Sequence, residues 1–104
     1  MINATMREYN YFLLSADTDD YGQQTLIKNE NGEPVIQGTI KMAISEASKS
    51  VLDNILYEGT SYIGITQEKG INDHYIIEYR GHKLKVQYIS EGRFISAFLG
   101  EYRG

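Results

Sequence analysis

The sequence predicts a mainly β fold, a small β-barrel or sandwich of about six to seven antiparallel strands. Nine tyrosines, ten glycines and a single proline in 104 residues are typical of short strands separated by tight turns. Apolar side chains recur at every second position over most of the chain, and only one segment has the spacing of a helix. At this length we expect one domain, residues 1–104, with a single modest core.

The first two expected strands are each followed by a strong turn sequence. The run EYNYFLL at residues 8–14 is rich in aromatic side chains and precedes an acidic turn at residues 17–22. The run QQTLIK at residues 23–28 ends just before Asn31 and Gly32, which favour a hairpin because both residues tolerate positive φ. Two strands and a hairpin are therefore expected in this part of the chain.

The third expected strand, GTIKMAIS at residues 38–45, alternates cleanly. Ile40, Met42 and Ile44 share one face of an extended chain, because successive side chains of a strand point to opposite faces. We expect these three side chains in the core and the other face to be largely solvated.

The second half of the chain contains four more candidate strands. They are SYIGIT, HYIIEY, KLKVQYIS and RFISAFLGEY, at residues 61–66, 74–79, 83–90 and 93–102. Turns are expected at Arg80-Gly81 and at Glu91-Gly92, where glycine interrupts the alternation. In KLKVQY, the alternation predicts Leu84, Val86 and Tyr88 in the core.

One segment breaks the β pattern. Apolar residues fall at helical spacing at Ala47, Val51, Leu52, Ile55 and Leu56, and Ser45 is a suitable N-cap. We expect one short helix or an extended loop, inserted around residues 45–56.

Charge is spread unevenly along the chain. Residues 1–78 carry 5 basic and 12 acidic side chains, a net charge of −7, whereas residues 79–104 carry 5 and 2, a net charge of +3. The total of −4 argues against a dedicated nucleic-acid binder, which is normally basic overall. Such asymmetry favours contact between the acidic part of one copy and the basic part of a neighbour.

The sequence offers little for catalysis or metal binding. There is no cysteine, and the calcium-like start at Asp17, Asp19 and Gly22 has Tyr21 at the fifth position and Lys28 where a bidentate carboxylate is needed. His74 and His82 have no third ligand at a recognisable spacing, and no nucleophile motif or phosphate loop occurs. We expect no enzyme, no cofactor and no metal site. No apolar run approaches the ~18 residues of a membrane span, and Arg7 and Glu8 interrupt any signal-peptide-like segment.

The segment GINDHYIIEYRGHKLKVQYISEGRFISAFLGEY resembles the C-terminal half of the head-closure proteins of long-tailed, siphovirus-type bacteriophages and related prophages. These proteins are also called stoppers or head-tail connectors. The matching residues are Asp73, Ile77, Tyr79, Arg80, Gly81, Leu84, Val86, Tyr88, Gly92 and Arg93. The resemblance covers about residues 36–102 and is closest over the last third.

The resemblance implies a Src-homology-3-like barrel with a structural role in the virion, assembled in the bacterial host cytoplasm. Such a protein would form a homo-oligomeric ring below the portal and adaptor connector proteins and would close the DNA-filled head after genome packaging. It would also provide the docking platform for the tail terminator or tail-tube proteins. The implied partners therefore include packaged DNA in the channel, bound non-specifically, and no membrane.

Two sets of residues follow from this resemblance and from the charge pattern. The first is a channel or gate segment, which the family places as an extended loop at residues 43–58, where our reading of the residues predicts a helix. Its candidate residues are Ser45, Glu46, Ser48, Lys49, Asp53 and Asn54. The second is an inter-subunit or partner face formed by Arg80, His82, Lys83, Lys85 and Arg93.

An alternative function is a small monomeric β-barrel that binds nucleic acid or a peptide. A basic strand with interleaved aromatic residues is one way in which a small β-domain holds a phosphate backbone. The residues that would serve this role are Tyr79, Arg80, Lys83, Lys85 and Tyr88.

Overall fold

The computed structural model describes residues 6–18, 21–22, 24–48 and 59–102, which form seven β-strands and no helix. The strands are β1 (Arg7–Thr18), β2 (Gln24–Leu26), β3 (Gly38–Glu46), β4 (Tyr62–Thr66), β5 (Tyr75–Tyr79), β6 (His82–Glu91) and β7 (Ile95–Glu101). All seven overlap the strands expected from the alternation, so the mainly β fold is confirmed.

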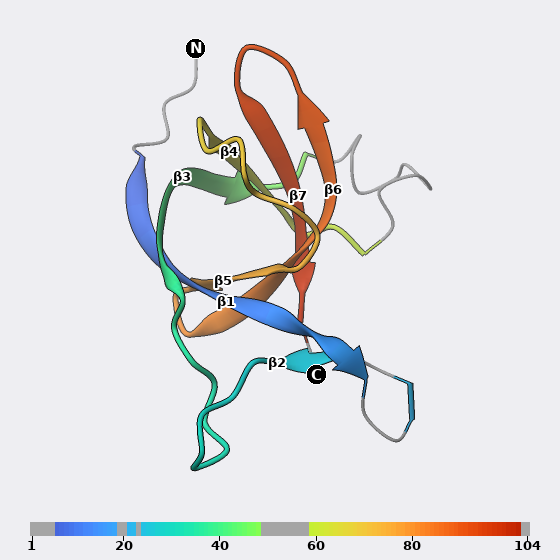
Figure 1. The fold of residues 1–104 in the computed structure, drawn as a ribbon. Helices are drawn as coiled ribbons and strands as arrows, with labels where there is room; N and C mark the ends of the chain where they lie inside the picture. Colours follow the sequence, from blue (N-terminus) through green and yellow to red (C-terminus); the bar gives the residue numbers. More distant parts are fainter. Residues whose placement is uncertain (1–5, 19–20, 23, 49–58, 103–104) are drawn as a thin grey trace.

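Six of the strands form a closed antiparallel barrel, in the order β1, β3, β4, β7, β6, β5 and back to β1 (Figure 1). Closure depends on the length of β1, whose first half pairs with β3 and whose middle pairs with β5. Tyr11 lies at the junction, because it is opposite Gly38 on one side and Ile77 on the other. Such closure removes the free sheet edges that promote pairing with other chains.

The interior of the barrel is filled by alternate side chains of all six strands. Its buried members are Ile40, Met42, Ile44, Ile71, Ile77, Tyr79, Leu84, Val86, Ile95, Ala97 and Leu99. The predicted inward face of β3 is therefore confirmed. Gly64 lies against Met42, which is fully buried. Because Gly64 has no side chain, the Met42 thioether occupies the space beside it. Among the described residues, no helix is long and apolar enough to cross a membrane.

The expected helix does not begin at Ser45. Ser45 and Glu46 continue β3, where they are paired with Ile63 and Tyr62 of β4. Both residues belong to the ladder between β3 and β4, so tertiary context overrides the capping preference of Ser45. The remainder of the expected helix, residues 49–58, lies outside the described residues.

A β-bulge in β6 overturns the predicted burial of Tyr88. Val86 is paired with Leu99 and Tyr88 with Phe98, which leaves Gln87 as an extra residue without a partner on β7. An extra residue reverses the alternation beyond it. Leu84 and Val86 are fully buried as predicted, but the Tyr88 side chain points outward and is 45% exposed.

The hairpin between β5 and β6 has the two-residue turn expected from the sequence. Tyr79 is paired with His82, and the intervening Arg80 and Gly81 both have positive φ, 49° and 81°. Two consecutive positive φ values define the type I′ geometry that matches the twist of paired strands.

Candidate interaction site

A second apolar cluster lies outside the barrel, against its outer wall. It consists of Phe12, Leu14, Leu26 and Ile76, with Tyr102 packed against it, and is called the outer cluster below. In β1, Tyr9 and Tyr11 pack against the barrel core, so alternation directs Phe12 and Leu14 to the outer face. Strand β2 is thus a cover on the barrel wall, and Leu26 is its buried contact.

A hollow of about 230 Å³ opens at the border of the outer cluster and is called the basic pocket below. Its lining includes Thr25, Leu26, Lys28, Pro34, Lys83 and Tyr102. These residues come from β2, from the segment that follows it, from the start of β6 and from the end of the described chain. The basic pocket therefore exists only because the fold brings four separated parts of the sequence together.

Contacts at the edge of the basic pocket position the Lys83 side chain and place the Tyr102 backbone beside Lys83. The Lys83 Nζ lies 5.4 Å from the centroid of the Phe12 ring, within the range of a cation–π interaction. The Tyr102 backbone N–H donates to the Lys83 carbonyl at 2.8 Å. Burial raises the pKa of the Tyr102 hydroxyl above its ordinary value of 10.0, so the group is a neutral hydrogen-bond donor at physiological pH.

The segment between β2 and β3 projects from the barrel as a hairpin, called the arm below (residues 27–36; Figure 1). The Val35 N–H donates to the Ile27 carbonyl at 3.0 Å. The Asn29 side-chain oxygen accepts from the backbone N–H groups of Asn31 and Glu33, which closes the turn predicted from Asn31-Gly32. The arm carries two exposed apolar side chains, Ile27 and Ile36, which are 38% and 52% exposed.

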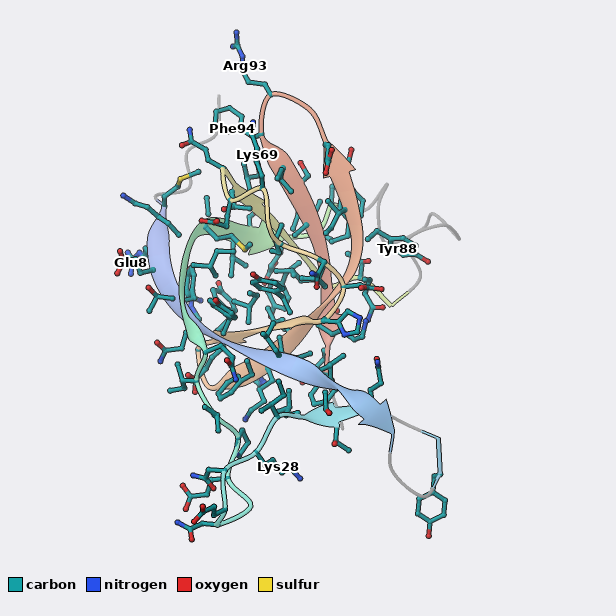
Figure 2. All side chains as sticks on the ribbon, in the orientation of Figure 1. Glu8, Lys28, Lys69, Tyr88, Arg93 and Phe94 are labelled. Atoms are coloured by element: carbon teal, nitrogen blue, oxygen red, sulfur yellow. The ribbon has the colours of Figure 1, made fainter. Side chains whose placement is uncertain are left out.

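A second projection is the turn between β6 and β7, called the tip below (residues 91–95). Figure 2 shows Arg93 and Phe94 at the end of the molecule opposite to Lys28 of the arm. Phe94 is 38% exposed, and Arg93 is exposed beside it. Lys69, from the loop after β4, lines a shallow hollow together with Glu91, Gly92 and Ile95.

The predicted partner face is only partly assembled. Arg80, His82, Lys83 and Lys85 lie at or near the turn between β5 and β6, where the His82 Nδ1 is 3.6 Å from a Glu101 carboxylate oxygen. Arg93 lies beyond the other end of β6, roughly 30 Å away along an extended strand. Four of the five residues therefore share one region, and the fifth belongs to the tip.

Two members of that region are already engaged within the chain. The Arg80 guanidinium lies 5.2 Å from the centroid of the Tyr79 ring. The Lys85 ammonium donates to the carbonyls of Asp73 and Val86, at 3.1 and 3.3 Å.

For the gate segment, the structure describes Ser45, Glu46 and Ser48, all of which are exposed. Ser45 and Glu46 end β3, and Ser48 follows it. Lys49, Asp53 and Asn54 lie outside the described residues, so the predicted gate stays a prediction.

The alternative binding surface is only partly assembled: Arg80, Lys83 and Lys85 share one region, but the two tyrosines do not complete it. Tyr79 is only 9% exposed, and its ring makes edge contacts with Tyr9 and Tyr62 in the barrel core, at centroid distances of 5.7 and 5.3 Å. A ring held in this way cannot stack on a base or cover a peptide. Tyr88 points outward beyond the bulge, seven positions along the same hairpin from Gly81.

The parts of the chain that the structure describes bring together no group of three side chains suited to a metal ion. Each histidine has one acidic neighbour instead. The His74 Nε2 lies 3.8 Å from an Asp73 oxygen, and His82 faces Glu101.

Sequence reasoning did not identify Lys28, Ile36, Phe94 or Tyr102 as members of a surface. For Ile36 and Phe94, the local sequence did indicate a possible surface position, because each is an apolar residue beside a turn. Lys28 and Tyr102 had none, because their proximity depends on β2 covering the barrel wall.

No protein-family model matches this chain, and no curated protein matches it significantly. The resemblance to head-closure proteins therefore stays a prediction, and the functional argument depends on the fold and its surfaces.

Proposed function

We propose that this chain is a structural virion protein that forms a ring below the portal and adaptor of a long-tailed phage. The ring closes the DNA-filled head and provides the docking platform for the tail. The proposal combines the sequence resemblance with one observation, the presence of two different apolar projections at opposite ends of a small closed barrel (Figures 1 and 2).

A cyclic assembly of identical subunits requires two different surfaces on each subunit, one complementary to the other. The arm and the tip have this relationship. Apolar Ile27 and Ile36 of the arm are accompanied by exposed Glu30 and Glu33 around its turn. Phe94 of the tip is accompanied by the exposed cations Arg93 and Lys69, although Glu91 lies beside them.

The closed barrel favours contact through these projections. Closure of the six strands leaves few free sheet edges for strand addition, so contacts through loops and side-chain patches are favoured. Apolar side chains at the centre of a polar rim are the usual composition of a specific protein interface. In the proposed ring, the arm of one copy contacts the tip of the next.

The test is assembly of the purified chain with the portal and adaptor proteins of the same phage, followed by electron microscopy. The wild-type chain is expected to add a closed ring to the complex. Ile36→Asp and Phe94→Asp each place a carboxylate in the proposed contact and should prevent ring formation while leaving the barrel folded. Gln67→Asp, at an exposed position in the loop after β4, is the matched control and should assemble normally.

A mixture of the two defective chains provides a sharper result. Ile36→Asp retains a functional tip and Phe94→Asp a functional arm, so the mixture can form one interface but cannot close. We expect heterodimers and no ring. Normal rings from either single variant would contradict the proposed contact, and a wild-type chain that never forms a cyclic complex would contradict the function itself.

A further inference from the structure

The lining of the basic pocket is unusual for an acidic protein. Among the described residues, its lining includes Lys28, Lys83, Thr25 and Tyr102 and no acidic residue, while the chain as a whole has a net charge of −4. Two cations that line one hollow create a local positive potential.

In the part of the chain that the structure describes, neither Lys28 nor Lys83 forms an ion pair with a carboxylate. Lys83 is half-buried, so part of its hydration is lost. Its cross-strand neighbour Glu78 accepts a hydrogen bond from the Asn10 side chain instead, at 3.3 Å. An incoming anion would compensate for the lost hydration of Lys83.

The Lys83 side chain and the backbone around the basic pocket are held in place before any ligand arrives. Lys83 is placed over Phe12, and its carbonyl accepts from the Tyr102 N–H. Lys28 is bridged to Pro34 across the arm, which fixes the backbone from which its side chain extends. Preorganised donors avoid much of the ordering cost of binding.

We propose that the basic pocket binds a phosphate group of a small solute, with Lys28 and Lys83 neutralising its charge and the hydroxyls of Thr25 and Tyr102 donating to its oxygens. Lysine recognises phosphate as a point charge, and hydroxyl side chains are common phosphate partners. A volume of about 230 Å³ is below the ~300 Å³ at which whole small-molecule pockets begin. The occupant is therefore the phosphate group itself, with any attached part outside. This site does not depend on the proposed ring.

The test uses the full chain labelled with ¹⁵N and titrated with inorganic phosphate at constant ionic strength, with acetate as the comparison anion. Phosphate is expected to give saturable shifts at the amides of Thr25, Leu26, Lys28, Lys83 and Tyr102, and acetate much smaller ones. Lys28→Gln and Lys83→Gln should each weaken phosphate binding by roughly tenfold, because each removes one charged hydrogen bond. Lys69→Gln removes the same charge at the other end of the molecule and should leave the affinity within about twofold.

Several outcomes would overturn the site. These are equal responses to phosphate and acetate, shifts located elsewhere on the barrel, or unchanged affinity in both pocket variants. Duplex DNA is added in a separate arm. If it moves the pocket amides in a salt-dependent manner while free phosphate does not, the assignment to a small solute is wrong. If Lys83→Gln does not fold, as judged from its NMR spectrum, the assignment is decided by the wild-type chain alone. The deciding results are then the positions of its shifted amides and its preference for phosphate over acetate.

Discussion

Replacing Gly64 with alanine introduces a methyl group into the barrel core at a place that is already occupied. The added carbon would overlap the Met42 sulfur, and it would lie 2.9 Å from the Met42 Cγ and 3.3 Å from a Leu99 methyl. Met42 and Leu99 are both fully buried, so neither side chain has free space to enter. The substitution therefore tests the packing on which closure of the barrel depends.

The size of the effect follows from these contacts. Overpacking of a well-filled core costs about 1–3 kcal/mol, and the middle of this range applies because the Cγ of Met42 is too near the backbone to swing aside. A loss of about 2 kcal/mol corresponds to a fall of about 10 °C in Tm for a domain of this size. Gly70→Ala is the matched control, since an added methyl there meets nothing within 4 Å, and its stability should change by less than about 1 kcal/mol.

A double-mutant cycle identifies the cause. Met42→Ala alone should cost about 3 kcal/mol through the cavity that it leaves. In that background the new methyl of Gly64→Ala enters the cavity, so the double variant should be more stable than the sum of the single effects by about 1–2 kcal/mol. Thermal and urea unfolding measure all four chains. An unchanged Tm for Gly64→Ala, or strict additivity in the cycle, would refute this packing.

Three further predictions concern the turn, the bulge and the tyrosines. Gly81→Ala should lower the free energy of unfolding by about 1 kcal/mol, because φ is 81° there and side chains disfavour that region; no change in thermal denaturation would argue against the type I′ turn. Leu84→Ala should lower the free energy of unfolding by about 3 kcal/mol, and Tyr88→Ala by less than about 1 kcal/mol, since the bulge directs Tyr88 to solvent. Equal losses of stability in urea unfolding would contradict the bulge. Burial raises the pKa of Tyr75 and of Tyr102 above 10.0. The unfolded chain therefore releases these two protons at lower pH than the folded chain, and the free energy of unfolding should fall as pH rises from about 9 to about 11. An equally steep decline in Tyr75→Phe would show that ionisation of Tyr75 does not contribute to it.

Local alternation was sufficient to predict the strands. Each of the six barrel strands has one face on the barrel core, so apolar residues at every second position, as at Ile40, Met42 and Ile44, directly report the structure. The turn at Arg80-Gly81 was equally local, because its geometry depends on two residues that both have positive φ.

The bulge in β6 could not be predicted in this way, because it is defined by the pairing of β6 with the neighbouring strand β7. The Gln87 side chain lies over Gly100, where an added Cβ would be 2.7 Å from the Gln87 amide nitrogen. Only glycine on β7 leaves room for this arrangement. Nothing in the alternating sequence KLKVQY indicates the bulge, so the prediction that Tyr88 lies in the core was wrong.

The outer cluster and the basic pocket beside it could not be predicted from local sequence either. Ile76 and Ile77 are both fully buried, one on each side of the barrel wall, because β2 and Tyr102 cover the outer face of β5. The sequence indicated that Lys83 was on a solvated face and that the C-terminal part was basic. That Lys83 shares a pocket with Lys28 and Tyr102 depends on contacts between distant parts of the chain.

The central claim is that this barrel is one subunit of a ring in which the arm of each copy meets the tip of the next. The most direct measurement is a reconstruction, by electron microscopy, of the chain assembled on its portal and adaptor. The proposal predicts closed rotational symmetry, with Ile36 of one copy in contact with Phe94 of its neighbour. A chain that stays monomeric in the presence of portal and adaptor, or a ring in which arm and tip face away from neighbouring copies, would contradict it.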